Sequence, residues 1–573
     1  MRPLRSRAWF AGEDETALAN RVALASSGIG VTADADRPVI GIANSASDLN
    51  PCNLPLAELA EAVRDGVRAA GGLPVVFPTM SLGEDLMKPT AMLYRNLLAM
   101  EIEETIRAYP LDGIVILANC DKTVPGAIMG AASADVPTIV VTAGARAPAV
   151  FRGHRIGTGT DLWRLWDERR TGRLSDEEWA ELERSLACGL GACNTMGTAS
   201  TMAILTEALG LMLPGSSSVA AEDPRRVPLA RDAGARAVGL IREELTPSKI
   251  LTPAAFRNAI RVLHAIGGST NAVIHLAAIA GRVGVPFELD DVRRFGADVP
   301  VLADIEPSGT GLMQDFDAGG GLPSLMREIA PLLETSAPTI TGAPLADVLG
   351  AAPAPHGAIR TADRPLREGG AFATVRGTLA PDGALVKTSA ATPSLLKHHG
   401  RAVVFRGYDD MRRRVEDPSL DADADSVLVL AGCGPVGAGM PEWGMVPIPR
   451  KLAEAGVRDM VRVTDARMSG TSFGTVFLHV APEAAIGGPL ALVQEGDPIT
   501  VDIEEGRLDL DVDEEELGRR RARWTPPGSP HLRGWPLLYR EHVMQAPDGC
   551  DLDFLRAPTP AHRRFVEPVV GRS

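Results

Sequence analysis

The stretch PVIGIANSASDLNPCNLPLAELAEAVRDGVRAAGGLPVVFP, residues 38–78, decides the fold class of this chain. Its two β-rich runs, PVIGIAN and LPVVFP, enclose a segment with apolar residues on one face at helical spacing: Leu56, Leu59, Ala60, Val63 and Val67. A glycine pair at 71–72 ends that helix. A strand, a helix and a second strand in this order predict parallel strands joined by a helical crossover.

The same alternation continues downstream. A helical stretch from about Ala91 to Tyr109 is stopped by Pro110, and DGIVILA (112–118), a further helical stretch and PTIVVTA (137–143) follow. We therefore predict an α/β fold whose N-terminal domain has a mainly parallel sheet flanked by helices. The charged stretch 155–186 is predicted to be a surface-exposed helical excursion.

A second domain is expected after the Ala-, Pro- and Gly-rich region near 338–368. Beyond it the β-rich runs are SVLVLAG (426–432), DMVRVTD (459–465), the apolar run 489–493 and the hairpin-like ITVDIEEGRLDLDV (499–512). We divide the chain into an N-terminal α/β domain, 1–368, and a C-terminal β-rich, barrel-like domain with helices, 369–573.

Composition excludes several classes of protein. The chain has 573 residues, 45% of them hydrophobic, and a net charge of -15, which argues against nucleic acid as a partner because phosphate backbones are held by clustered cations. Its apolar runs are shorter than the roughly 20 residues a bilayer requires, and no signal-peptide core follows the basic start. We predict a cytoplasmic protein with no membrane partner.

Six cysteines are too few for a disulfide framework, and no CxxC or HExxH motif occurs, so a metal site must be assembled from distant segments. Cys52, Cys120 and Cys193 lie in polar or Gly-, Pro- and Asn-rich loops at element boundaries. Each alone is more often a small buried side chain. A helix predicted just beyond Cys193 would stabilise a thiolate there. Three more are predicted to be structural: Cys188, Cys433 and Cys550.

Carboxylates also follow the predicted strands. Glu84 follows the second strand, and Asp121 with Lys122 follows the third, so we expect them at one edge of the sheet, where ligands bind in such folds. By default they are solvated charges, but Mg²⁺ prefers carboxylate oxygens. The glycine-rich runs around Glu442 and Ser469 are ordinarily turns, yet each follows a strand of the second domain and could face the cleft between domains. Signals for nucleotide binding are weak, since no GxxxxGK[ST] occurs.

Eight long motifs in order resemble the dihydroxy-acid dehydratase and 6-phosphogluconate dehydratase family. They are NSASDLNPCN (44–53), SLGEDLMKPTAMLYRNLLAM (81–100), NCDKTVPG (119–126), GACNTMGTASTM (191–202), AIGGSTNAVIHL (265–276), LAPDGALVKTSAA (379–391), GMPEWG (439–444) and DARMSGTSFGTVFLHVAPEA (465–484). The resemblance covers about 36–555, and the tail EHVMQAPDGCDLDFL is similar to the branch of L-arabinonate and D-xylonate dehydratases.

The resemblance implies a hydro-lyase that dehydrates a sugar (aldonic) acid to a 2-keto-3-deoxy acid. By the same resemblance, Cys52, Cys120 and Cys193 ligate an iron–sulfur cluster, [2Fe–2S] rather than [4Fe–4S]. Mg²⁺ would be held by Glu84, Asp121, Glu442 and carbamylated Lys122, and Ser469 would be the base, with Thr471 nearby. The family also implies a homodimer or homotetramer.

Three alternatives stay open at this point. Within the class, the alternative is the dihydroxy-acid dehydratase of branched-chain amino-acid biosynthesis. From other classes, an iron–sulfur electron carrier or sensor would usually need a fourth well-placed cysteine. A metal-free α/β binding protein would be colourless. The sequence does not name the sugar acid, because its stereochemistry is read by the shape of the pocket.

Overall fold

The computed structural model describes residues 3–33, 36–528 and 533–556. In the first part of the chain four parallel strands form a sheet in the order β2-β1-β3-β4. Most residues of β1, β3 and β4 are buried, as in sheets covered on both faces. The strands are β1 (Val39–Asn44), β2 (Leu73–Pro78), β3 (Gly113–Leu117) and β4 (Thr138–Val141). The predicted parallel α/β architecture is confirmed.

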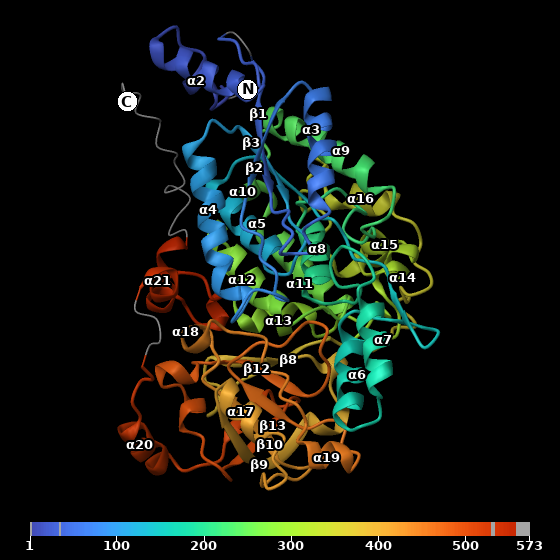
Figure 1. Cartoon of the computed structure of the whole chain (residues 1–573), viewed down its shortest axis with the longest axis vertical. Coiled ribbons are helices and arrows are strands. Elements are labelled where there is room, and N and C mark those ends of the chain that lie inside the picture. Colours follow the sequence, from blue (N-terminus) through green and yellow to red (C-terminus); the bar gives the residue numbers. More distant parts are fainter. Residues whose placement is uncertain (1–2, 34–35, 529–532, 557–573) are drawn as a thin grey trace.

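Helices cover both faces of this sheet (Figure 1). The crossover helix α3 packs against α9 on one face, and α4 packs against α5 on the other. Further helices continue the domain below the strands. The helices named here are α3 (Leu56–Ala69), α4 (Arg95–Ala108), α5 (Thr123–Ala134), α8 (Thr198–Ala208), α9 (Arg226–Arg242), α11 (Pro253–Ala265), α12 (Asn271–Val283) and α13 (Leu289–Gly296).

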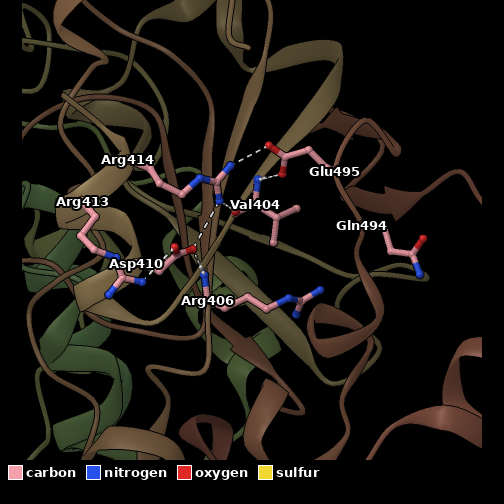
Figure 2. Close-up of a pocket in the computed structure, with 7 residues that line it drawn as sticks. All are labelled: Val404, Arg406, Asp410, Arg413, Arg414, Gln494 and Glu495. Atoms are coloured by element: carbon pink, nitrogen blue, oxygen red, sulfur yellow. Dashed lines mark hydrogen bonds and ion pairs between the residues drawn. The ribbon is translucent and has the colours of Figure 1, made fainter. Parts of the chain in front are cut away.

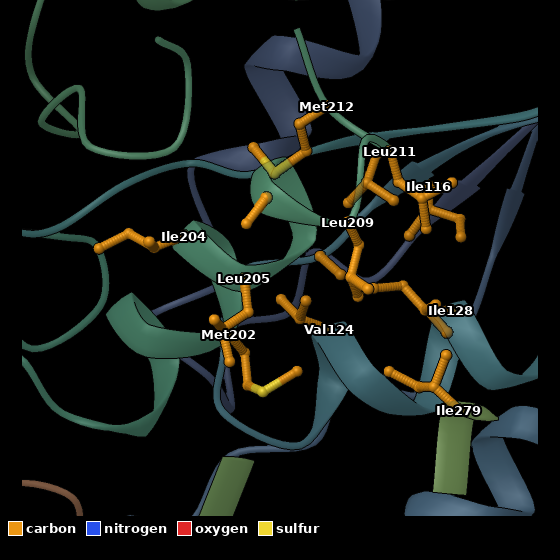
Figure 3. Packing of buried hydrophobic residues seen from close by; sticks show 14 of the residues in the cluster. Ile116, Val124, Ile128, Met202, Ile204, Leu205, Leu209, Leu211, Met212 and Ile279 are labelled. Atoms are coloured by element: carbon orange, nitrogen blue, oxygen red, sulfur yellow. The ribbon is translucent and has the colours of Figure 1, made fainter. Parts of the chain in front are cut away.

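One continuous apolar core joins these helices to the sheet. Figure 3 shows α8 in its centre, with Leu205 and Leu209 near Val124 and Ile128 of α5. Each of these four side chains is at most 1% exposed. Burying a side chain of this size stabilises the fold by about 1.5–3 kcal/mol. The helix that follows the loop of Cys193 is therefore fixed by packing on all sides.

The second part of the chain forms an eight-stranded sheet in the order β14-β13-β9-β10-β11-β12-β8-β7. Its middle strands are parallel and its flanking strands antiparallel. A bridge between Arg376 and Arg507 connects the two edges, so the sheet is nearly closed, as predicted for a barrel-like domain. The strands are β7 (Ala373–Val375), β8 (Gly383–Val386), β9 (Lys397–Arg406), β10 (Val427–Ala431), β11 (Arg462–Thr464), β12 (Val476–Ala481), β13 (Pro498–Asp502) and β14 (Arg507–Leu510).

One local prediction from the sequence is confirmed, and two differ from the structure. The predicted hairpin is confirmed, with Ile499 of β13 opposite Leu510 of β14. The helix expected from Ala91 begins as a 3-10 turn, because Thr90 caps Met92 before α4 starts. The apolar run 489–493 forms a 3-10 helix, Pro489–Leu492, instead of a strand, since Pro489 opens it directly after two glycines.

The excursion is helical, as predicted. A two-stranded hairpin, β5 (Ala149–Phe151) with β6 (His154–Ile156), leads into α6 (Thr160–Arg170) and α7 (Asp176–Leu186). Figure 1 shows α6 and α7 together at one side of the molecule, beside the place where the two parts of the chain meet.

The end of the described chain returns to the first domain. Helix α21 (Gly534–His542) and the turn after it join an apolar cluster with Met92, Leu93 and Ile274. The guanidinium group of Arg95 donates to the carbonyl oxygens of Gly549 (2.7 Å) and Cys550 (2.9 Å). The last described segment is thus packed against Arg95, which lies 454 and 455 positions earlier in the chain than these two residues. In the residues described, we find no helix with the length and apolarity needed to cross a bilayer.

Candidate active site

The loops that leave β1 and β3 are locked together by one asparagine. Asn53 accepts hydrogen bonds at Oδ1 from the backbone N–H groups of Asn119 (3.0 Å) and Cys120 (2.9 Å). Asn119 in turn donates to the carbonyl oxygen of Cys52 at 2.8 Å. The two cysteine-bearing loops therefore meet at the carboxyl edge of the sheet, where the sequence predicted a site.

Three thiols converge at this edge. The side chains of Cys52 and Cys120 are hydrogen-bonded, which together with burial raises the pKa of Cys120 well above its ordinary value. Burial, and next the neighbouring Cys52, raise the pKa of Cys193 to about 12. Arg146 lies beside them, with its guanidinium 3.9 Å from the sulfur of Cys52. The three cysteines predicted as cluster ligands are thus neighbours in space.

One expectation about Cys193 is wrong. The sequence suggested a helix N-terminus that would stabilise its thiolate, but α8 begins only at Thr198. The field of a helix end fades within about one turn, so burial among other thiols outweighs it. Buried thiols with raised pKa values lose their protons only when a nearby cation compensates the negative charge of the thiolates.

A second group, next to the thiols, is made of carboxylates around one lysine. The Nζ atom of Lys122 contacts Asp121, lies 3.3 Å from Glu442 and lies 4.0 Å from Glu84. The lysine side chain is fully buried. The sulfur of Cys120 is 3.4 Å from Oδ1 of Asp121, so the thiol and carboxylate groups adjoin. The structure therefore brings together the residues that the sequence assigned to two metal centres.

Arg467 and Asn271 complete the carboxylate group and were missed from the sequence. Arg467 is buried and donates to Glu442 at 2.9 Å, while its other nitrogen lies 3.6 Å from Glu84. Asn271 donates to the same Glu442 oxygen at 2.8 Å. Both residues stand inside quoted motifs, DARMSGT and GGSTNAV, so polar side chains in those motifs were the available signal.

In this group the effect of burial on each pKa is opposed by the charges of the neighbouring side chains. Burial raises the pKa of Glu84, against the nearby Lys122. Burial would also raise the pKa of Glu442, but Lys122 and Arg467 hold it below its ordinary value. For Lys122, burial and Arg467 lower the pKa, yet the three carboxylates together raise it above its usual range. Three carboxylates thus surround the ammonium group of Lys122.

Ser469 and Thr471 lie on the loop after β11. The two hydroxyl oxygens are 3.0 Å apart. The loop presses on the start of α8: a Cβ atom at Gly470 would stand 2.6 Å from the backbone nitrogen of Thr198, so only glycine fits. Thr198 also accepts a hydrogen bond of 2.9 Å from Asn271, the residue that binds Glu442. This chain of contacts connects the serine loop to the carboxylates.

The residues present suit the two groups that the sequence implies. Three neighbouring thiols are the ligand set of an iron–sulfur cluster with one iron left open. The ammonium of Lys122, surrounded by three carboxylates, stands in for a cation with oxygen ligands. Across the described part of the chain, no three His, Cys, Asp or Glu side chains are already arranged around a common metal position. The carboxylates are instead turned toward Lys122 and Arg467.

Comparison with known proteins identifies the family. The model of the dihydroxy-acid/6-phosphogluconate dehydratase N-terminal domain matches residues 37–348, and that of the C-terminal domain matches 357–550. This chain belongs to that dehydratase family. It is therefore an enzyme, a hydro-lyase, as predicted from its motifs.

Relatives of this dehydratase match over nearly their whole length. L-arabonate dehydratase of Azospirillum brasilense is 48% identical, covering 98% of both chains. The 6-deoxy-6-sulfo-D-gluconate dehydratase of Pseudomonas putida is 47% identical, over 97% of this chain and 96% of its own. A dihydroxy-acid dehydratase of Ignicoccus hospitalis is 40% identical, over 90% of this chain and 95% of its own.

The dehydratase also has an open groove of about 610 Å³ on its second domain (Figure 2). Four of its charged groups form two ion pairs: Arg414 with Glu495 at 2.9 Å, and Arg413 with Asp410 at 3.4 Å. None of the predicted site residues lines it. The groove is bounded by Val404, Arg406, Asp410, Arg413, Arg414, Gln494 and Glu495. The groove therefore adds no residue to the candidate site at the strand ends.

Proposed function

We propose that this enzyme dehydrates a sugar (aldonic) acid to a 2-keto-3-deoxy acid. The observation that carries the proposal is the junction of the thiol and carboxylate groups, where Cys120 and Asp121 are adjacent in the chain and 3.4 Å apart at their side chains. Two centres side by side can hold two neighbouring carbons of one substrate. An acid with hydroxyls at C2 and C3 has the required spacing.

The chain supplies ligands for both centres. Cys52, Cys120 and Cys193 would hold a [2Fe–2S] cluster, and three cysteines rather than four favour substrate binding over electron transfer. Mg²⁺ would be held by Glu84, Asp121, Glu442 and carbamylated Lys122. When bound, the cluster supplies a Lewis acid for the C3 hydroxyl, and Mg²⁺ supplies positive charge beside the substrate carboxylate.

The residues of the chain would then carry the proton. Ser469 takes the C2 proton, a step that builds negative charge next to the carboxylate. A serine hydroxyl is a weak base unless its alkoxide is stabilised, and Thr471 offers its hydroxyl and a backbone N–H that lies 3.4 Å from Ser469 Oγ. The C3–O bond then breaks, the departing hydroxide takes up the proton that Ser469 removed from C2 and becomes water, and the enol that remains tautomerises to the 2-keto acid.

A sugar acid is favoured over a branched-chain dihydroxy acid by the relatives. The two sugar-acid dehydratases named above are 47% and 48% identical, against 40% for the dihydroxy-acid dehydratase. The alternative function is accordingly dihydroxy-acid dehydration in branched-chain amino-acid biosynthesis. Cytoplasmic location and a homodimer or homotetramer stay predictions from the sequence.

The deciding experiment is a substrate screen with protein purified without oxygen. Five- and six-carbon aldonates and 2,3-dihydroxyisovalerate are incubated with the enzyme and Mg²⁺, and the 2-keto acid formed is measured. We expect turnover of at least one aldonate, with much less of dihydroxyisovalerate. Turnover of dihydroxyisovalerate alone would establish the alternative, and a colourless protein without any turnover would contradict both.

A further inference from the structure

Three residues of one short segment converge on Thr471. Trp163 donates its indole N–H to Thr471 Oγ1 at 3.0 Å. Thr160 donates its hydroxyl to the carbonyl oxygen of Thr471 at 2.9 Å. Gly159, the residue before α6, lies so close that a Cβ atom there would be 2.5 Å from Thr471 Cγ2. The first turn of the excursion helix is therefore built around this one threonine, more than 300 positions later in the chain.

The direction of these hydrogen bonds matters for Ser469. An indole N–H only donates, so one lone pair of Thr471 Oγ1 is occupied by Trp163 and the threonine proton points elsewhere. The other hydroxyl partner of Thr471 is Ser469, at 3.0 Å. A serine alkoxide has no proton to give, so Thr471 must be the donor when Ser469 is deprotonated.

We propose that Trp163 is a positioning residue, which holds the hydroxyl of Thr471 as a donor to Ser469. The inference rests on the proposed role of Ser469 as the base. In the sequence, the excursion between 155 and 186 looks like a surface addition. By this inference it takes part in the chemistry of the dehydratase.

The physical reason is cooperation along the chain of donors. In the sequence Trp163 N–H, Thr471 O–H, Ser469 oxygen, the Thr471 hydroxyl accepts from Trp163 and donates to Ser469, and hydrogen bonds linked in this way polarise and strengthen each other. Hydrogen bonds to a charged oxygen are also stronger than those to a neutral one. Trp163 therefore stabilises the alkoxide more than the neutral serine, although it does not touch Ser469.

Besides its contacts with the serine loop, the helix that carries Trp163 is held by other segments at both of its ends. At the far end of α6, Arg170 donates to the carbonyl oxygen of Ile448 at 2.8 Å and lies 3.2 Å from Glu416. Asp161 accepts a hydrogen bond from the backbone N–H of Gly157 at 2.8 Å, which secures the start. Both ends of the helix are thus tied down while its indole reaches Thr471.

The test removes the indole N–H donor and keeps an aromatic side chain at the position. Trp163→Phe removes the N–H, and Trp166→Phe is the matched control, since Trp166 lies on the same helix, is 45% exposed and packs against Trp179. We expect Trp163→Phe to lower the rate of substrate C2-hydrogen exchange and kcat by roughly 10-fold, the value of one ordinary hydrogen bond, with KM unchanged. Trp166→Phe should match wild type.

A second measurement does not need activity. In ¹⁵N-tryptophan-labelled protein, the indole resonance that is lost in Trp163→Phe should shift in Thr471→Val and stay in place in Thr471→Ser. Combining Trp163→Phe with Thr471→Val should add little to the loss in kcat, because both act through one hydroxyl.

Two results would overturn the inference: an indole resonance that ignores Thr471→Val, or a kcat of Trp163→Phe equal to that of the control. A wild-type protein that turns over none of the acids would refute the proposed function and the catalytic role with it. In that case the resonance shift would still establish the contact, so the two failures are told apart.

Discussion

The Nζ atom of Lys122 lies 3.3 Å from Oε1 of Glu442, across a sequence separation of 320 residues. Lys122 immediately precedes α5 of the first domain, and Glu442 belongs to a loop of the second. The carboxylate group therefore exists only when both domains are folded and in contact.

Replacing Lys122 by arginine tests its role as a ligand. Arginine keeps the positive charge but has no amine that can be carbamylated, so we expect bound Mg²⁺ to be lost and activity to fall by about 100-fold or more. Metal content by mass spectrometry and turnover check this. Lys397→Arg, at an exposed pair with Asp502, is the control. Near-normal activity of Lys122→Arg would mean that the lysine is a structural ion-pair partner.

Cysteine variants test the cluster. Cys52→Ser, Cys120→Ser and Cys193→Ser should each remove the visible absorbance of an iron–sulfur centre, because serine is a poor ligand for it. Cys433→Ala is the control, since Cys433 lies in a separate apolar cluster. Iron content and the absorption spectrum are measured after anaerobic purification. Full iron content in any of the three serine variants would show that its cysteine is not a ligand.

Ser469→Ala should leave the protein folded and the metals bound. Loss of a general base lowers the rate by about 10² to 10⁴, and exchange of the substrate C2 hydrogen should fall with turnover. Ser324→Ala removes a buried hydroxyl that bonds the carbonyl oxygen of Pro353, and it should cost stability only. If Ser469→Ala exchanges and turns over within a few-fold of wild type, another group is the base.

His264 predicts a dependence of stability on pH. It is fully buried, accepts from the backbone N–H of Ala371, and burial lowers its pKa from 6.5 to about 4. The folded state therefore binds fewer protons than the unfolded state between these values, so the free energy of unfolding falls as pH drops through that window, by ~3 kcal/mol in all.

The measurement is urea unfolding at several pH values between 6.5 and 4. His264→Asn keeps an acceptor near Nδ1 but does not titrate, so the difference in stability between wild type and variant should shrink steadily on acidification. The exposed His356 gives the control, and His356→Asn should follow wild type at every pH. A parallel pair of curves for wild type and His264→Asn would refute the prediction.

The buried ion pair of Arg282 and Asp551 should be costly to break. Two hydrogen bonds of 2.6 Å and 2.9 Å join them, and their side chains are 0% and 1% exposed. Asp551→Asn leaves the buried guanidinium with only its longer ion pair to Glu103, at 3.5 Å, and we expect a loss of about 3 kcal/mol in the free energy of unfolding. Glu61→Gln, at an exposed pair with Arg64, should change little. Equal effects of both variants would contradict this.

Much of this architecture was readable from local pattern. The spacing of apolar residues predicted β1, α3 and β2 to within a few residues, because buried side chains recur with different periods in helices and in strands. The convergence of Cys52 and Cys120 at one sheet edge followed from parallel topology alone. The glycine-rich runs after strands suggested that Glu442 and Ser469 could face the first domain, but the grouping of Lys122 with Glu442 followed only from the family resemblance, since no local rule pairs them.

What sequence reasoning missed depends on distant packing. Arg467 is an isolated cation in its motif, and only the fold shows it between Glu84 and Glu442. Trp163 belongs to a charged segment that reads as solvent-exposed, and its contact with Thr471 arises because Gly159 permits a close approach. The pKa of Cys193 was misjudged because burial by other segments cannot be seen from its neighbours in the chain.

Because the last described segment packs on the first domain, the first domain is synthesised long before one of its packing partners. Arg95 leaves the ribosome 455 residues before Cys550, whose carbonyl oxygen receives its guanidinium. At about 5–20 residues per second, that interval lasts from about 20 s to about 90 s. Throughout it Met92 and Leu93 of the nascent first domain lack the part of their cover that comes from Tyr539, Val543 and Leu552. We expect this surface to be a binding site for holding chaperones until translation ends.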